Sequence, residues 1–156
     1  MENINDQQLL ERAMRLCARR EICSSDLLAR LTAWGAGESL SHRLLQILKE
    51  KNFVDDRRYA LSYARQQHNL RKWGRIRIRM VLQQKNIPEA FIDEALQELD
   101  EEEYRQTLKE ELKKKRKSLK GKNRYDLLAR LQKFAYGRGY EPDLARKVAE
   151  EVVDQS

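Results

Sequence analysis

Apolar residues recur along the chain at helical spacing, in three sets that match one another. Each set has the i, i+4, i+5, i+8 spacing that places side chains on one face of an α-helix. Before each set stands the same signal: an apolar residue, three others, a Gly or Asn, and a second apolar residue. Gly and Asn adopt the left-handed conformation that ends a helix, so Gly35, Asn86 and Gly139 are predicted helix ends. The three sets are Leu40, Leu44, Leu45, Leu48; Phe91, Ala95, Leu96, Leu99; and Leu144, Val148, Ala149, Val152.

This periodicity predicts a unit of three helices repeated three times. Within each unit, one helix closes at the predicted helix end and the next carries the matched apolar set. A further helix is expected at the start of each unit, over roughly 7–20, 55–69 and 101–117. Each unit takes about 50 residues, the length typical of a small helical repeat. We therefore predict an all-α fold made of three tandem three-helix repeats, at residues 1–53, 54–100 and 101–156.

Three local features refine this pattern. Residues 75–80 alternate between Arg and apolar residues, which by itself favours a strand. We predict a helix there, because the repeat register aligns Ile78 and Leu82 with Leu27 and Leu31 of the first unit. A lone strand among helices would also have no strand to pair with. Asp55 is expected to cap the helix that follows it. Residues 118–123 are expected to form a loop with Gly121 as its break.

The composition fits a water-soluble helical protein. Of 156 residues 37% are charged and 40% hydrophobic, with six Gly and two Pro. Unbroken apolar runs reach three residues at most, so we expect no membrane span. The first residues have neither a basic start nor an apolar stretch, so we expect no secretory signal. With two cysteines, Cys17 and Cys23, no disulfide framework is expected, and we predict a cytoplasmic location.

Charge is distributed in alternating blocks. Residues 57–85 carry nine Arg or Lys and no acidic residue, whereas residues 89–103 carry eight Asp or Glu and no basic one. Residues 109–124 are again mostly basic, and the net charge of the chain is +7. Such blocks can meet both a polyanion and a charged protein surface.

Catalytic motifs are missing from the sequence. The short glycine pairs lack the spacing and the Lys-Ser/Thr of a phosphate-binding loop. His42 and His68 have no ligand-like neighbours at metal spacing, and Cys17 and Cys23 are interpreted as small helix residues. Asp55 and Asp56 resemble a carboxylate pair, but capping explains them better. We therefore predict no enzymatic activity, no cofactor and no metal.

The strongest binding signal is a basic stretch with an aromatic residue inside it. Arg75 and Arg79 are four residues apart and share a helix face, and a helix start near Gly74 would offer backbone N–H groups to an anion. A solvated basic face, with Trp73 covering the core, explains the same pattern. A second basic run follows at 113–117, where a solvated helix end is the alternative. The candidate contact residues are Arg57, Arg71, Lys72, Trp73, Arg75, Arg77 and Arg79, and secondarily Lys113, Lys114, Lys115, Arg116 and Lys117.

These features leave two binding functions open. Basic and aromatic side chains together suit single-stranded nucleic acid, in which phosphates meet cations and bases stack on rings. Three helices per unit are also typical of helix-turn-helix proteins that read duplex DNA on their own. No unit shows an evident recognition helix, so the second interpretation is the alternative.

The middle unit resembles the RecX family of regulatory proteins. Residues 52–65, NFVDDRRYALSYAR, are similar to that family's GYLDD-x-RFA-x-x-Y-x-R, and residues 74–87, GRIRIRMVLQQKNI, to its G-x-x-R-I-R-x-x-L-x-x-K-G-I. Residues 18–27, ARREICSSDL, are similar to A-x-R-E-x-S-x-x-E-L, while the third unit matches mainly by register. Asn52 and Asn86 replace usual glycines, and Ala36 replaces a larger apolar residue.

The resemblance implies a modulator of the RecA recombinase with an elongated, curved array of repeats. It implies binding in the groove of the RecA–DNA filament, and lower strand exchange, ATP hydrolysis and coprotease activity in the SOS response. We expect a monomer whose partners are the RecA filament and filament-bound or single-stranded DNA. The basic helices would face DNA phosphate and acidic protein, and the acidic block at 89–103 a basic protein surface.

Overall fold

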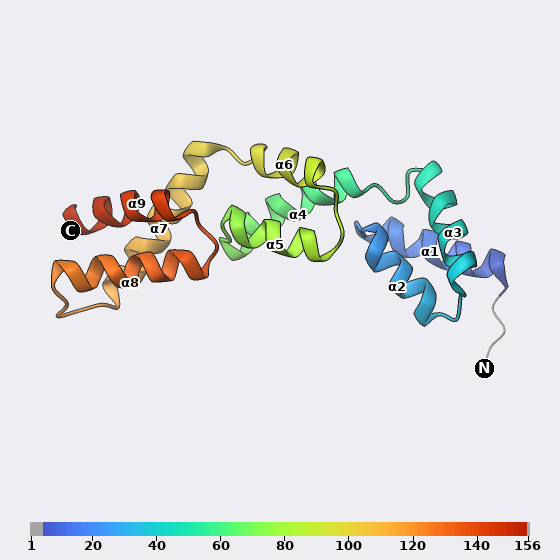
Figure 1. Cartoon of the computed structure of the whole chain (residues 1–156), viewed down its shortest axis with the longest axis horizontal. Helices are drawn as coiled ribbons and strands as arrows, with labels where there is room; N and C mark the ends of the chain where they lie inside the picture. The colour runs from blue at the N-terminus through green and yellow to red at the C-terminus, as the bar shows by residue number, and fades with distance from the viewer. Residues whose placement is uncertain (1–4, 156) are drawn as a thin grey trace.

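The structure is a computed structural model that describes residues 5–155, and these residues form an elongated row of short helices (Figure 1). Among them the secondary structure is helical and includes no strand, which confirms the predicted all-α fold and the helix over 75–80. The helices are α1 (Asp6–Arg19), α2 (Ser24–Ala33), α3 (Glu38–Glu50), α4 (Asp56–Arg71), α5 (Arg75–Gln84), α6 (Glu89–Gln97), α7 (Glu101–Lys117), α8 (Arg124–Gly137) and α9 (Pro142–Asp154).

Helix ends follow the sequence signals closely. Gly35, Asn86 and Gly139 have φ of 96°, 59° and 91°, the left-handed values predicted for them. The Asp55 carboxylate accepts a hydrogen bond from the Arg58 N–H at 3.0 Å, which confirms Asp55 as the cap of α4. Gly121, at φ 78°, lies in the loop between α7 and α8.

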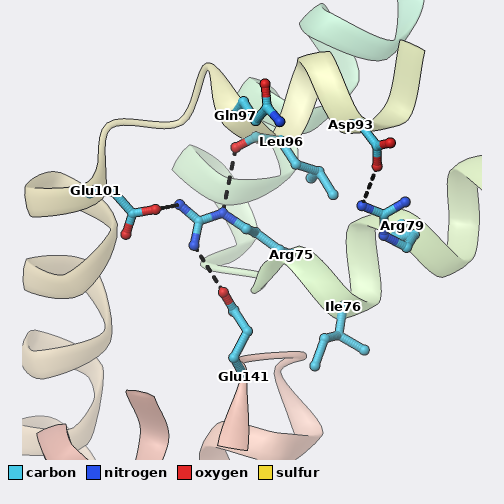
Figure 2. A pocket seen from close by; sticks show the side chains of 8 residues that line it. All are labelled: Arg75, Ile76, Arg79, Asp93, Leu96, Gln97, Glu101 and Glu141. Carbon is cyan, nitrogen blue, oxygen red and sulfur yellow. Dashed lines mark hydrogen bonds and ion pairs between the residues drawn. The ribbon is translucent and has the colours of Figure 1, made fainter. Parts of the chain in front are cut away.

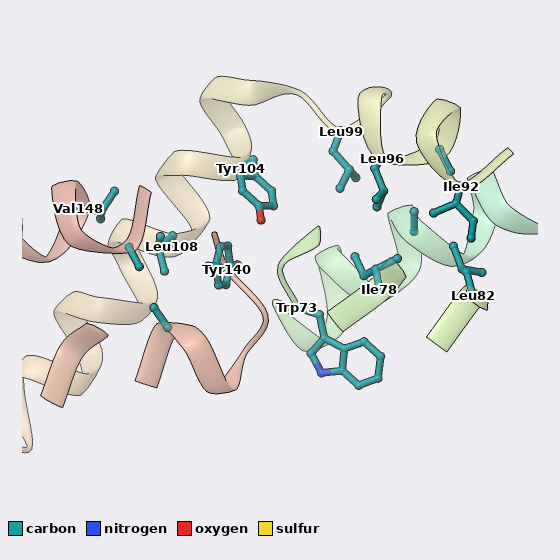
Figure 3. Packing of buried hydrophobic residues seen from close by; sticks show 14 of the residues in the cluster. Trp73, Ile78, Leu82, Ile92, Leu96, Leu99, Tyr104, Leu108, Tyr140 and Val148 are labelled. Carbon is teal, nitrogen blue, oxygen red and sulfur yellow. The ribbon is translucent and has the colours of Figure 1, made fainter. Parts of the chain in front are cut away.

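We call α1–α3 repeat 1, α4–α6 repeat 2 and α7–α9 repeat 3. Repeat 1 has a hydrophobic core of its own, centred on Leu27, Leu31 and Leu48, which are fully buried. Repeats 2 and 3 instead share one continuous core (Figure 3). The predicted boundary at 100/101 therefore stays an interpretation of the repeat pattern, since the two units it separates are packed together.

Repeats 1 and 2 meet mainly through polar contacts. The Ser24 N–H donates to Asp56 at 2.8 Å, and the Ser25 hydroxyl donates to the Lys85 carbonyl at 2.8 Å. Lys85 also pairs with Asp26 at 2.7 Å. Cys23 adds an apolar contact, because its buried side chain joins the core of repeats 2 and 3. No helix among residues 5–155 is both long enough and apolar enough to cross a membrane.

Three rings join repeats 2 and 3 at their shared core. The Tyr104 ring lies 5.1 Å from His68 and 5.1 Å from Tyr140, centroid to centroid. The Tyr140 hydroxyl donates to the Lys72 carbonyl at 2.8 Å, and His68 Nδ1 lies 2.9 Å from the Trp73 carbonyl. His68 is only 5% exposed, and its Nε2 is buried with no hydrogen-bond partner among residues 5–155.

The buried His68 makes the stability of this junction depend on pH. Burial lowers the pKa of His68 from its ordinary value of 6.5 because the charged ring loses hydration. The folded state then binds a proton less readily than the unfolded chain, so stability is complete above 6.5 and decreases as the pH falls below it. We expect the free energy of unfolding to decrease on acidification from pH 7.5 to 5, measured by urea denaturation.

His68→Asn isolates this effect. Asn retains an N–H donor near the Trp73 carbonyl but does not titrate, so part of the acid sensitivity is expected to disappear. His42→Asn, at an exposed position, is the matched control. An identical pH slope in the His68 variant and the wild type would contradict the assignment.

Candidate functional site

The arginines of the middle repeat divide into two groups according to their partners. Arg57, Arg75 and Arg79 pair with carboxylates of the acidic block or with Glu141, the residue before α9. Arg58 pairs with Glu21 of repeat 1. Arg57 pairs with Glu94, and this hydrogen bond lowers the pKa of Glu94. Arg79 lies 2.6 Å from Glu89 and 2.7 Å from Asp93, both on or beside α6. Much of the basic block thus meets the acidic block of the same chain.

Arg75 is the most enclosed of these arginines. Its side chain is 17% exposed and pairs with Glu101 at 2.7 Å and Glu141 at 2.9 Å (Figure 2). Its guanidinium carbon also lies 3.9 Å from the centroid of the Tyr104 ring, and the Tyr104 hydroxyl donates to Glu141. Arg75 therefore ties α5 to α7 and α9.

The start of α5 is closed to an external anion, contrary to the sequence-based expectation. The Gly74 and Ile76 N–H groups donate to the Arg138 and Gly139 carbonyls at 2.7 and 2.9 Å. The Arg75 N–H donates to the Tyr104 hydroxyl at 2.9 Å. Repeat 3 therefore occupies the N–H groups that the sequence pattern predicts to be open to an anion.

Trp73 is not available for base stacking, which corrects its assignment as an aromatic platform. Its side chain is buried in the shared core and is 8% exposed. The guanidinium carbons of Arg71 and Arg77 lie 5.3 and 4.2 Å from the ring centroid. Trp73 thus covers the core, as the alternative interpretation proposed, and positions two cations by cation–π contact.

A basic surface extends from Arg71, Lys72 and Arg77 of repeat 2 onto repeat 3. The Arg138 guanidinium donates to the Arg71 carbonyl at 3.3 Å, and Arg77 donates to the Gly137 carbonyl at 3.3 Å. Beyond Arg138 lies a groove of about 410 Å³ between α7 and α8. In the part of the chain that the structure describes, these cations form no ion pair with a carboxylate. We call this surface the basic seam: Arg71, Lys72, Arg77, Lys115, Arg130, Lys133 and Arg138.

Phe134 supports the seam on repeat 3. The ring lies in the wall of the groove, with Lys115 Nζ 5.5 Å and the Arg138 guanidinium carbon 4.9 Å from its centroid. The buried Trp73 ring and the partly buried Phe134 ring thus each contact two cations of the seam. Unpaired cations at fixed positions suit the phosphates of a nucleic acid backbone.

The second basic run divides between two faces of α7. Lys115 belongs to the seam, whereas Lys113, Arg116 and Lys117 border a separate groove of about 290 Å³ with Val152. Lys114 is exposed. The five consecutive cations therefore do not act as one surface, because successive residues of a helix point about 100° apart.

Sequence reasoning missed Arg130, Lys133 and Arg138. These residues lie outside the two basic blocks, and the fold alone brings α8 beside the end of α4. One local signal could have indicated Arg138. It lies between Gly137 and Gly139, directly before the predicted helix end that aligns with Asn86. Within residues 5–155, no group of three His, Cys, Asp or Glu side chains is arranged to hold a metal ion.

The fold and the site define a tandem-repeat protein of three-helix units with a basic surface at the junction of repeats 2 and 3. The model of the second three-helix domain of RecX matches residues 55–96, and that of the third three-helix domain matches residues 101–149. The chain belongs to the RecX family of regulatory proteins.

Individual relatives agree with this assignment. The regulatory protein RecX of Vibrio campbellii is 32% identical over 133 residues, which cover 85% of this chain and 84% of the relative. That of Clostridium perfringens is 29% identical over 138 residues, 87% of this chain but 64% of the relative. The crystal structure of RecX from Lactobacillus salivarius matches with a TM-score of 0.87 at 15% identity, over 97% of both chains, and shows the same fold.

Proposed function

We propose that the protein regulates the RecA recombinase by lying along the RecA–DNA filament and inhibiting the recombinase, ATPase and coprotease activities of RecA. Family membership supports the RecA partner. The mode of action rests on the basic seam, a set of cations without carboxylate partners among the described residues that extends from repeat 2 to repeat 3. On an elongated body such a surface can contact a nucleic acid backbone inside a filament.

The proposed action is binding rather than catalysis, in the cytoplasm and as a monomer. An elongated array of repeats can touch adjacent protomers of a polymer, so that several weak contacts add through their high effective concentration. The seam would face DNA phosphate, while other faces of the repeats remain free for RecA itself. Lys113, Lys114, Arg116 and Lys117 stay secondary candidates for contact with the filament.

An ATPase assay tests the proposal. RecA is assembled on single-stranded DNA, the protein is added in increasing amounts, and the rate of ATP hydrolysis is measured. We expect the rate to decrease with added protein, and the protein to sediment with the filament. In parallel, fluorescence anisotropy measures binding to duplex DNA without RecA.

The ATPase assay and the duplex-binding assay together distinguish a RecA regulator from a stand-alone DNA-binding regulator. A stand-alone helix-turn-helix regulator would bind a preferred duplex sequence without RecA, with a preference that survives high salt. Unchanged ATP hydrolysis together with such sequence preference would contradict the proposal and support that alternative.

A further inference from the structure

The helix that contributes Arg77 to the basic seam also presents an apolar stripe to solvent. Ile76 and Met80, four residues apart on α5, are 48% and 51% exposed. Residues at this spacing share one face of a helix, so the two side chains form a continuous stripe. Because successive residues are rotated by about 100°, Arg77 flanks the stripe on one side, and Arg75 and Arg79 flank it on the other.

The side of the stripe away from the seam opens into a groove of about 330 Å³. Ile76 and Leu96 supply apolar surface, and Figure 2 shows Arg75 reaching toward Glu101 and Glu141 and Arg79 toward Asp93. The groove therefore lies where repeats 2 and 3 meet, and its walls come from both of them. We call it the junction groove; it is lined by Arg75, Ile76, Arg79, Asp93, Leu96, Gln97, Glu101 and Glu141.

The lining of this groove carries one negative charge in excess, because Arg75 and Arg79 are outnumbered by Asp93, Glu101 and Glu141, and Glu89 beside the groove adds another. Each guanidinium is shared by two carboxylates: Arg75 by Glu101 and Glu141, and Arg79 by Glu89 and Asp93. Each set therefore has one negative charge in excess. The carboxylates are also the more exposed partners, since the Glu101 side chain is 82% exposed and that of Arg75 is 17% exposed.

From this apolar stripe and its excess negative charge, we infer that the junction groove binds a Lys- or Arg-bearing segment of a protein partner. The aliphatic part of such a side chain would pack on Ile76 and Met80. Its cationic end would meet Asp93 and Glu101, the carboxylates on the rim. Nucleic acid is repelled by this groove and attracted by the seam, so α5 separates a protein-facing flank from a phosphate-facing flank.

Under the proposed function, on which this inference rests, the partner segment belongs to a RecA protomer in the filament. The protein would then touch DNA phosphate with one flank of α5 and RecA with the other. The contacts with RecA are testable independently of the contacts with DNA, because different residues make them.

The test compares two double variants. Ile76→Ser with Met80→Ser removes the apolar stripe, and both positions are exposed, so folding is not expected to change. Asp93→Asn with Glu101→Gln removes one carboxylate from each arginine, while Arg79 keeps Glu89 and Arg75 keeps Glu141. For each variant, affinity for RecA filaments on single-stranded DNA, for RecA alone and for single-stranded DNA alone is measured.

We expect each double variant to bind RecA filaments and RecA alone about tenfold more weakly, with affinity for DNA alone not reduced. Leu70→Ser, at an apolar position 75% exposed on α4, is the control for the stripe. Glu38→Gln with Glu110→Gln, at exposed positions outside the groove, is the control for charge. Neither control is expected to weaken binding to RecA.

The outcomes distinguish the inference from the proposed function. If the wild type inhibits RecA and both double variants bind it equally well, the inference is wrong while the proposed function stands. If the wild type binds neither RecA alone nor its filaments, both are wrong. Sedimentation that shows self-association of the wild type, lost in the variants, with unchanged RecA binding would identify a second copy as the occupant and overturn the inference.

Discussion

Gly74→Ala is expected to separate repeats 2 and 3, because Gly74 lies directly against the backbone of the partner repeat. A Cβ atom at Gly74 would lie 2.3 Å from the Gly139 carbonyl oxygen, closer than such atoms approach in proteins. The obstacle is backbone, so no side chain can turn aside to relieve the clash. The two chain segments must move apart.

The movement would break several contacts at once. The hydrogen bonds from the Gly74 and Ile76 N–H groups to repeat 3 would lengthen, and so would the bond from the Tyr140 hydroxyl to the Lys72 carbonyl. Overpacking costs about 1–3 kcal/mol and each lost hydrogen bond about 1 kcal/mol, so we expect a loss of about 3 kcal/mol. That corresponds to roughly 10 °C in melting temperature.

Gly37→Ala is a matched control. Gly37 caps α3 with φ −71° and ψ 167°, close to the −82° and 169° of Gly74 at the start of α5. A Cβ at Gly37 would meet no atom within 4 Å, so the control carries the same loss of a glycine cap without the clash. Trp34→Phe in both variants leaves Trp73 as the fluorescence reporter of the junction. Equal melting temperatures in the two alanine variants would contradict the argument.

The sequence predicted the helical units well because their signals are local. A helix end at Asn86 or Gly139 depends on one residue entering the left-handed region, and the apolar faces depend on spacing within a single helix. The Asp55 cap depends on a side chain three residues from its partner. Such features can be inferred from a short window of sequence, whatever surrounds it.

The site was less predictable because it depends on contacts between helices far apart in sequence. The block at 57–85 indicated a free basic surface, yet Arg75 pairs with Glu141, 66 residues away. The run at 113–117 indicated one surface, yet helix geometry divides it between two. Conversely, Arg138 joins the seam through Arg71, 67 residues away, a proximity that charge counting along the chain does not contain.

These pairings also change which variants are informative. Replacing Arg75 by alanine would leave Glu141 with less compensation in a partly buried place, so its effect would mix stability with binding. Arg79 and Arg57 raise the same difficulty through their own carboxylates. Lys72, Arg130 and Lys133 avoid it, since they belong to the seam but make no ion pair or ring contact among the described residues.

Lys72→Glu, Arg130→Glu and Lys133→Glu together are expected to weaken binding to single-stranded DNA by on the order of 100-fold at low salt. Each phosphate contact releases condensed counterions, and three fewer contacts lower the slope of log affinity against log salt by about 2. Reversal of charge adds repulsion to this loss. If the seam faces DNA in the filament, inhibition of the RecA ATPase decreases in parallel.

A lower net positive charge would by itself weaken binding to a polyanion, so the control variant must lower the net charge by the same amount. Arg15→Glu, Arg30→Glu and Lys49→Glu reverse three exposed cations of repeat 1, away from the seam. Their effect on the salt slope is expected to be small, because diffuse attraction is screened beyond about 10 Å at 0.1 M salt, whereas contacts with phosphate persist. Equal slopes for the two triple variants would mean that the seam makes no local contact with phosphate, and that charge acts only at a distance.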